Sequence, residues 1–220
     1  MTEDQWRAGR DPLAMLHLLS NSSGVRKWRL FAVEACRKAL ERFDYPQLAP
    51  ALDYGATLAD DFSTACVGDL DDVFDELGLG LDGASETLWR LVEAVVYSHR
   101  HRVLDVGTGR GVIEAIQEAY WAGVVGSKGD DDFAFQADLL REFFGNPFAA
   151  PWFKPRWRTS DVLQLARCIH EIRAFDRLPV LADALEEAGC GQADILGHCR
   201  EPGDHRRGCW VLDLILEKPE

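Results

Sequence analysis

The sequence predicts an all-α protein built of antiparallel helical hairpins, packed as an irregular bundle or a short helical array. Three observations favour this class. Apolar residues recur at helical spacing through most of the chain, capping residues precede these segments, and the apolar–polar alternation that marks β-strands is nearly absent. With 220 residues, 47% of them hydrophobic, the chain is long enough to bury a core, and we do not expect intrinsic disorder.

An N-terminal helical lobe is expected over residues 1–59. Thr2 and Gln5 fit a capping box, and Asp11 followed by Pro12 marks the start of a second helix. A longer amphipathic helix of about five turns is predicted after these two, because its apolar residues repeat along one face. Pro46 and Pro50 bound a short segment, and LAPALDYGATLADDF is expected to continue as a helix.

An acidic connection is predicted over residues 60–86, which carry nine acidic residues and no basic one. The wider stretch 51–98 holds 11 acidic residues and only Arg90 as a base, in a chain whose net charge is −13. An acidic surface of this kind repels phosphate backbones, so binding to nucleic acid is disfavoured. It suits a basic protein partner, or simply solubility.

A C-terminal helical lobe is predicted over residues 87–220, either separate from the first lobe or packed with it as one domain. The helix FQADLLREFF is expected to stop at GNP, and Ser160 or Asp161 is expected to cap the next helix. A helical hairpin is predicted to turn at Gly189, Cys190 and Gly191. The last apolar stretch, CWVLDLIL, fits a strand or a helix equally well.

Three passages resemble an uncharacterised, heavily duplicated family of bacterial helical proteins that is often found with a short repeat-companion domain. They are LLREFFGNPF (139–148), IRAFDRLPVLADALEEAGC (172–190) and HCREPGDHRRGCWVLDLILEK (198–218). The opening DPLAMLHLL and RKWRLFAVEACRKAL is similar to the start of the same family, and LADALEEAG is similar to the companion signature ADWLEERG. The resemblance implies a helical fold with a small repeated helix-turn-helix unit. It supplies no catalytic residues, and residues 50–135 depart from it.

The stretch VLDVGTGRG is similar to the cofactor loop of a methyltransferase that uses S-adenosylmethionine. An apolar run ends in Asp105, and three glycines follow that would let the backbone approach the cofactor: Gly107, Gly109 and Gly111. A second acid is expected roughly 20 residues further on, and residues 130–132 lie near that distance. The other buried strands of a doubly wound sheet are missing from the sequence, so a glycine-rich connection between helices is favoured. A small methyltransferase stays the enzyme alternative.

A second candidate site is a cysteine and histidine set near the C-terminus, which comprises Cys190, His198, Cys199, His205 and Cys209. The loop CREPGDHRRGC could bring Cys199, His205 and Cys209 together around a structural zinc ion. The spacing contains no C-x-x-C pair, and the adjacent His198 and Cys199 are not both expected to face one ion. In the competing interpretation the cysteines pack in the core, while His205 caps a helix or faces solvent.

Nucleophilic cysteine chemistry is disfavoured by the sequence. A reactive cysteine needs a base within hydrogen-bonding reach. Cys168 has His170 only two positions away, on a different helix face. The pair of Cys209 and His205 fits the spacing better, provided that the last helix begins early.

A mixed aromatic and basic passage, PWFKPRWR, has the composition of a stacking platform for single-stranded nucleic acid. Aromatic residues between prolines more often pin an extended segment onto a helical core, and this interpretation is favoured. Nucleic acid therefore remains an unlikely partner.

The sequence as a whole predicts a non-enzymatic interaction or adaptor module in the cytoplasm. We expect a protein partner, contacted through the acidic residues 51–98 or the aromatic residues 150–158. No signal peptide or membrane-spanning run is recognised, and the six cysteines are typical of reduced thiols. No cofactor is expected in this interpretation, and S-adenosylmethionine and zinc belong to the two alternatives.

Overall fold

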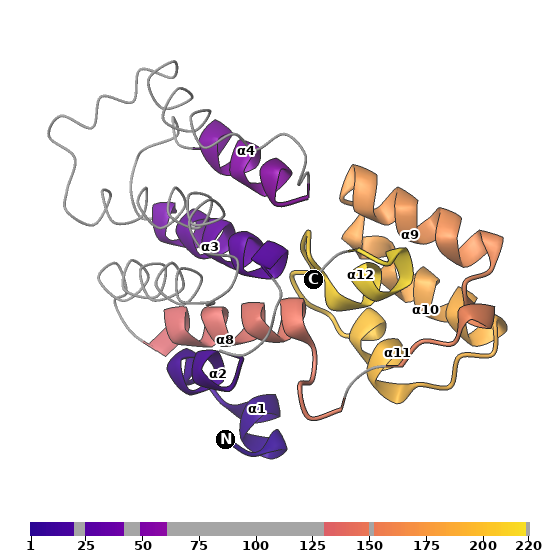
Figure 1. Ribbon diagram of the computed structural model, residues 1–220, viewed down its shortest axis with the longest axis horizontal. Helices are drawn as coiled ribbons and strands as arrows, with labels where there is room; N and C mark the ends of the chain where they lie inside the picture. Colours follow the sequence, from indigo (N-terminus) through magenta and orange to yellow (C-terminus); the bar gives the residue numbers. More distant parts are fainter. Residues whose placement is uncertain (20–24, 42–48, 61–129, 150–151, 219–220) are drawn as a thin grey trace, which may run out of the picture. The chain divides into compact units, whose positions relative to one another are not determined.

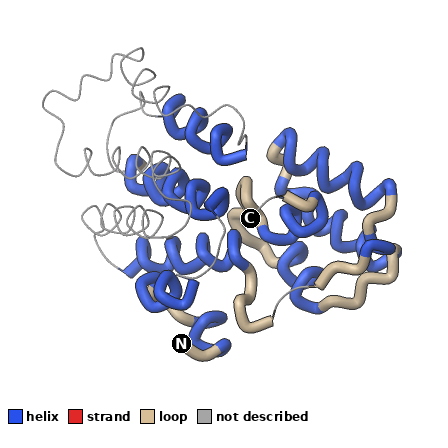
Figure 2. Tube along the Cα trace, in the orientation of Figure 1, coloured by secondary structure: helices blue, strands red, loops and turns tan. Residues whose placement is uncertain are grey.

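The computed structural model describes residues 1–19, 25–41, 49–60, 130–149 and 152–218 (Figure 1). Every regular element in these ranges is helical, and no strand occurs within them (Figure 2). The predicted all-α class is therefore confirmed. The acidic connection predicted after Asp60 and the glycine loop lie outside the described residues. Among the described helices, none is long and apolar enough to cross a membrane.

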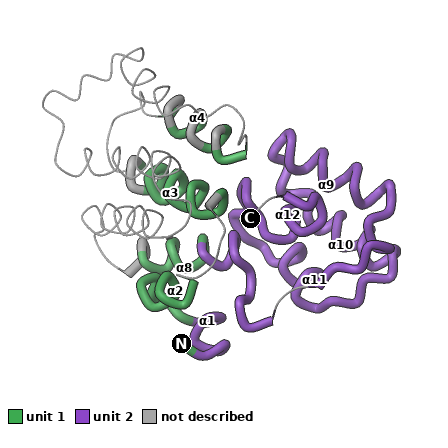
Figure 3. Tube along the Cα trace, in the orientation of Figure 1, with its two compact units in different colours: residues 1, 9–139, 220 green, residues 2–8, 140–219 purple. Residues whose placement is uncertain are grey.

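The chain divides into two compact units (Figure 3). Unit 1 comprises residues 1, 9–139 and 220, and unit 2 comprises residues 2–8 and 140–219. Unit 2 is thus built from two separate stretches of chain, and its N-terminal stretch is a short helix. The lobe boundaries expected at 59 and 87 border or fall in residues that the structure does not describe.

Unit 1 contains α2 (Pro12–Leu19), α3 (Val25–Leu40), α4 (Ala49–Asp60) and the first part of α8 (Asp130–Phe144). The carboxylate of Asp11 accepts hydrogen bonds from the first backbone amides of α2, which confirms the expected helix start. Helix α3 packs against α4. The fully buried guanidinium of Arg26 forms an ion pair with Asp60, so these two helices are held by charge as well as by apolar packing.

Unit 2 contains α1 (Glu3–Ala8), the end of α8, α9 (Ser160–Ile172), α10 (Leu178–Glu187), α11 (Ala193–Arg200) and α12 (Trp210–Leu216). Its core is formed where α9 packs on α10 and α12, and α11 packs on α10 and α12. The residues facing this core are fully or almost fully buried, among them Val162, Ile169, Leu181, Leu185, Ile195, Val211 and Ile215. The ambiguous stretch CWVLDLIL forms a helix.

Helix α9 begins one or two residues earlier than expected. Thr159 is its N-cap, and the Thr159 hydroxyl accepts a hydrogen bond from the backbone N–H of Val162 at 3.3 Å. The Ser160 hydroxyl instead donates to Asp161. The prediction that Ser160 or Asp161 caps this helix was therefore wrong by one or two positions, because three neighbouring residues all carry a suitable oxygen.

The short helix α1 starts with the predicted capping box and docks on the end of α8. The Thr2 backbone N–H donates to the Gln5 side chain at 2.8 Å, and the Gln5 backbone N–H donates to the Thr2 hydroxyl at 3.3 Å. The indole N–H of Trp6 then donates to the carbonyl of Gly145 at 2.9 Å. Because Trp6 is 1% exposed, α1 is fixed to the rest of unit 2 by a buried anchor.

Candidate metal centre

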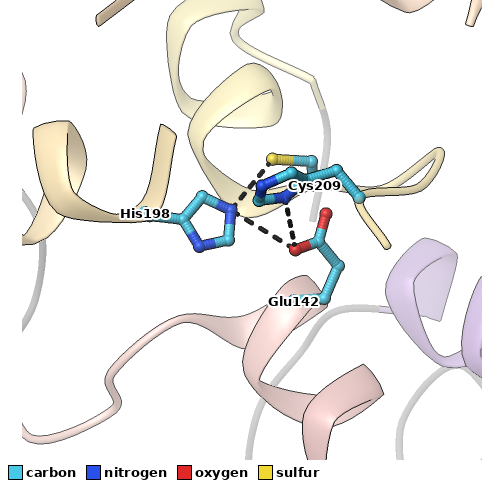
Figure 4. Close-up of side chains that lie close together, drawn as sticks. Glu142, His198 and Cys209 are labelled. Carbon is cyan, nitrogen blue, oxygen red and sulfur yellow. Dashed lines mark hydrogen bonds and ion pairs between the residues drawn. The ribbon is translucent and has the colours of Figure 1, made fainter. Parts of the chain in front are cut away.

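Four side chains that can bind a metal ion meet in unit 2. They are Glu142, His198, His205 and Cys209, and their ligand atoms all lie within 4.8 Å of one another. Figure 4 shows the labelled side chains of Glu142, His198 and Cys209 converging from different elements. This cluster, which we call the EHHC centre, is the only group of at least three such residues found in the described part of the chain.

Each residue of the EHHC centre is delivered by a separate piece of structure. Glu142 lies in the last turn of α8 and His198 in the last turn of α11. His205 follows in the loop after α11, and Cys209 is the N-cap of α12. Gly208, with φ of 99°, lets the loop reverse just before Cys209, since residues with a side chain rarely adopt this conformation.

The atoms facing one another are close enough to share one ion. His198 Nε2 lies 3.2 Å from Cys209 Sγ and 3.3 Å from Glu142 Oε2. His205 Nδ1 lies 3.0 Å from the same carboxylate oxygen. Two donors on one tetrahedral zinc ion lie about 3.3–3.6 Å apart, given zinc–ligand bonds of about 2.0–2.3 Å. The three contacts therefore need only small side-chain movements to reach that spacing.

Outer contacts orient the donors. His205 Nε2 lies 3.2 Å from the backbone carbonyl of Glu201, on the side of the ring away from the centre. The backbone N–H of Arg206 donates to Glu142 Oε1 at 3.1 Å, which leaves Oε2 facing the histidines. A histidine ligand usually donates its second ring N–H to a carbonyl or carboxylate in this way, because the bond fixes the ring and its tautomer.

The two imidazole rings pack edge to face, with centroids 4.8 Å apart. Their pKa values are shifted in opposite directions. Burial lowers the pKa of His198 to about 4; the attraction of Glu142 opposes this shift, and the neighbouring His205 adds to it. Burial alone would also lower the pKa of His205, but its hydrogen bond to Glu142 and the Glu142 charge outweigh burial and raise it. His198 is therefore neutral at pH 7, which is the form that binds metals.

The thiol of Cys209 is inert without a metal ion. Its side chain is fully buried, and burial, followed by the nearby Glu142 charge, raises its pKa well above the ordinary value. A buried thiol of this kind stays protonated and is a poor nucleophile. His205 also precedes α12 instead of lying one turn away on it, so the favourable helical spacing considered for this pair does not occur.

The structure brings together two of the three residues that the sequence favoured for zinc, His205 and Cys209. It adds His198, which belonged to the wider cysteine and histidine set, and Glu142, which the sequence did not nominate. Cys199 is not part of the EHHC centre: it is buried in the core, where burial raises its pKa to about 12. Neighbouring residues on a helix point about 100° apart. This is why the adjacent Cys199 and His198 face different surroundings, and why His198 is the one that joins the centre.

Glu142 was missed because nothing local distinguishes it from the other acidic residues. It lies 63 residues before His205, in a helix that carries several other acidic residues. His205 is 9% exposed at its side chain and bonded to Glu142. The interpretation in which His205 faces solvent therefore does not hold, whereas the expected burial of Cys190, Cys199 and Cys209 does.

The glycine loop with Asp105, Gly107, Gly109 and Gly111 lies outside the described residues, and its cofactor hypothesis stays a prediction. Cys168 Sγ accepts a hydrogen bond from Arg177 at 3.6 Å.

The aromatic passage is anchored in unit 2. Trp157 is 2% exposed within the core, Phe153 packs edge to face on it, and Lys154 lies over the Trp157 ring. Only Trp152, which is 54% exposed, remains largely at the surface. These contacts fit the interpretation in which the aromatic residues pin an extended segment onto the core.

Comparisons of the chain with protein-family models, with curated proteins and with solved structures gave no match. The chemistry of the EHHC centre therefore follows from its own donors. Two imidazole nitrogens, one thiolate and one carboxylate suit zinc, which accepts all three ligand types and favours four of them in a tetrahedron. The centre supplies four protein ligands, as a structural zinc site does, whereas catalytic sites commonly keep one position for water.

Proposed function

We propose that unit 2 is a zinc-binding helical domain in which the EHHC centre holds a structural metal ion. The observation that carries this proposal is the convergence of four different ligand side chains, from α8, α11, the following loop and α12, on one point. Three of these side chains are at most 14% exposed and the fourth is fully buried. Side chains of this type are seldom buried together unless they share protons or a cation.

Zinc would relieve a conflict that the metal-free centre contains. Both histidines approach the same oxygen of Glu142, and His198 also faces the Cys209 sulfur. Without a metal ion these contacts need protons between the lone pairs. With zinc, the four lone pairs would point at one cation, and the protons on His205 and Cys209 would be released.

A zinc titration of the purified full-length chain tests the proposal directly. After treatment with a chelator, native mass spectrometry and calorimetry should detect one zinc ion per chain. Cobalt(II) in place of zinc should give the absorption of a tetrahedral site with a thiolate ligand, because the Cys209 sulfur would be a ligand. Zinc should also raise the unfolding temperature, since binding to the folded state alone stabilises it.

Matched variants separate the EHHC centre from incidental binding. Cys209→Ser and His198→Asn each remove one ligand and should abolish binding of one zinc ion. Cys168→Ser and His17→Asn change a cysteine and a histidine outside the centre and should leave binding unchanged. Absence of zinc binding by the wild-type chain, or equal binding by all four variants, would overturn the proposal.

We further propose that the zinc-stabilised domain serves a non-enzymatic interaction or adaptor protein of the cytoplasm. Ile172 and Val180 support this role, because they are 67% and 53% exposed and flank the connection between α9 and α10. Cys168, Cys190, Cys199 and Cys209 are free thiols, which suits a reducing compartment. The acid excess of residues 51–98 favours a basic partner.

Site-specific photo-crosslinking in cells tests the interaction role. A photoreactive residue at position 172 or 180 should capture a defined, basic protein. The same residue at the exposed position of Gln164, on the same helix as Ile172, should not capture it. Equal capture from all three positions would contradict an interface at the α9–α10 connection.

A further inference from the structure

The end of α8 carries both a ligand of the EHHC centre and the anchors of the N-terminal helix. Glu142 faces the two histidines. One residue earlier, Arg141 Nη1 donates to the carbonyl of Trp6 at 2.7 Å. Three residues after Glu142, the carbonyl of Gly145 accepts the indole N–H of Trp6 at 2.9 Å. The metal ligand and two contacts to α1 therefore lie within five consecutive residues.

The next residue extends the same docking surface. Asn146 Nδ2 donates to Glu3 Oε1 at 2.7 Å, so the first and the middle parts of α1 are both bound to the end of α8. The hydrogen bond from Asn146 is also the largest of the effects that lower the pKa of Glu3.

Trp210 connects this docking surface to the EHHC centre from the other side. It follows the ligand Cys209 directly, and its ring centroid lies 5.2 Å from that of His198. The same indole ring packs on Gly145, where even one added carbon would lie 3.0 Å from it. Gly145 is thus held between the anchor Trp6 and a ring that touches a metal ligand.

Helix α1 depends on this surface for its own stability. It has six residues, whereas an isolated helix in water needs about 12–15 to be even marginally stable. The last turn of α8 is itself a helix end, where backbone hydrogen bonds are incomplete. A zinc ion that joins Glu142 to the ligands at the end of α11 and the start of α12 would therefore stabilise the last turn of α8. It would also stabilise α1, which docks on that turn.

We propose that zinc occupancy of the EHHC centre controls the docking of α1 on the end of α8. This inference rests on the proposed zinc site, and it adds what the metal ion regulates. Zinc ties the last turn of α8 to α11 and α12, and thereby sets the position of Gly145 and Arg141 for Trp6. Because coupling between two binding events is reciprocal, a docked α1 also raises the affinity of the centre for zinc.

Amide hydrogen exchange of the full-length chain, with and without added zinc, tests the coupling. Zinc should slow exchange at least about tenfold in residues 3–8, because opening of α1 then requires a more ordered α8 end to be disrupted. Residues 178–187 of α10, which carry no ligand and no contact described above with α1, serve as the internal control and should change little. In Glu142→Gln, zinc should no longer affect α1.

The failures of the two proposals are distinguishable. If zinc binds and slows exchange in residues 198–212 but leaves residues 3–8 unchanged, the coupling is overturned while the zinc site stands. If zinc does not bind the wild-type chain, both are overturned.

A reciprocal measurement gives a second test. Trp6→Phe keeps an aromatic ring but removes the indole N–H, so it should lower the zinc affinity about fivefold. Thr159→Ala removes the α9 cap, whose hydrogen bond is to Val162 of the same helix, so it should leave the zinc affinity unchanged. Equal affinities of Trp6→Phe and wild type would contradict the proposal.

Discussion

Gly145 lies against the indole ring of Trp210, so closely that a Cβ atom on Gly145 would be 3.0 Å from ring atom Cδ2. Gly145 also has φ of 63° and terminates α8. Gly145 must therefore satisfy two physical requirements. Its backbone is left-handed, and it has to leave room for the Trp210 ring. Both are met by glycine alone, because any side chain would meet the ring.

Gly145→Ala should accordingly destabilise the protein more than an ordinary substitution at a positive φ. Gly189→Ala is the matched control, since Gly189 has φ of 83° but no neighbouring atom within 4 Å of the place where a Cβ would lie. In this control variant the strained left-handed backbone alone should lower the free energy of unfolding by about 1–2 kcal/mol. In Gly145→Ala the steric conflict with the ring should lower the free energy of unfolding by a further amount of about 1–3 kcal/mol. Urea denaturation measures the stability of both variants. Equal losses of stability would show that the Trp210 ring can move aside without an energetic penalty.

Thr159→Ala should lower the free energy of unfolding by about 1 kcal/mol, because it removes the side-chain cap of α9. Ser160→Ala, one residue on, should change it by less than about 0.5 kcal/mol, as exposed surface substitutions usually do. Thermal or urea denaturation of the two variants distinguishes the positions. A larger loss for Ser160→Ala would mean that the helix starts where the sequence pattern placed it.

Arg158→Lys should lower the free energy of unfolding by about 1.5–3 kcal/mol, the usual contribution of hydrogen bonds to a charged group. The guanidinium of Arg158 donates to the carbonyl oxygens of Ile215 and Leu214 at 3.0 and 2.9 Å, which are among the last acceptors of α12. Lysine cannot donate in this forked geometry, although it keeps the favourable charge at a helix C-terminus. The exposed Arg156→Lys is the control, and similar urea midpoints for the two variants would argue against the capping role.

The stability of the metal-free protein should depend on pH through His198. Its pKa is lowered to about 4 in the folded state, against 6.5 ordinarily, mainly by burial. Between those values the unfolded chain binds a proton that the folded chain does not, so stability is lost as the pH falls. When the pH is lowered from 7 to 5 in the presence of a chelator, the free energy of unfolding of the wild type should fall by about 2 kcal/mol more than that of His198→Asn.

His205 contributes with the opposite sign, because its folded pKa is raised. Its stabilisation is fully present below the ordinary pKa and is lost as the pH rises through the raised value. This contribution is shared by wild type and His198→Asn, so to a first approximation it cancels in the comparison. Parallel pH profiles for the two proteins would show that His198 does not resist protonation in the folded state.

The sequence by itself determined the helical class and several of the helix ends in the described residues, although α8 begins at Asp130, earlier than the stretch FQADLLREFF. The Thr2–Gln5 capping box, the start of α2 at Asp11 and the stop after Phe144 all follow from the residues at those positions. Such signals are readable because a helix and its caps involve residues within about four positions of each other. Where several caps compete, as around Thr159, the local signal identifies the region but not the residue.

Only the tertiary structure decided which side chains form the EHHC centre. Sequence spacing nominated His205 and Cys209 because they share one loop. It also nominated Cys199, but the side chain of this residue faces the core of unit 2. It gave no reason to choose Glu142, which packing brings to within 3.0 Å of His205 from 63 residues away. A donor set assembled from distant segments depends on how helices pack, and that is fixed by the apolar faces of all of them together.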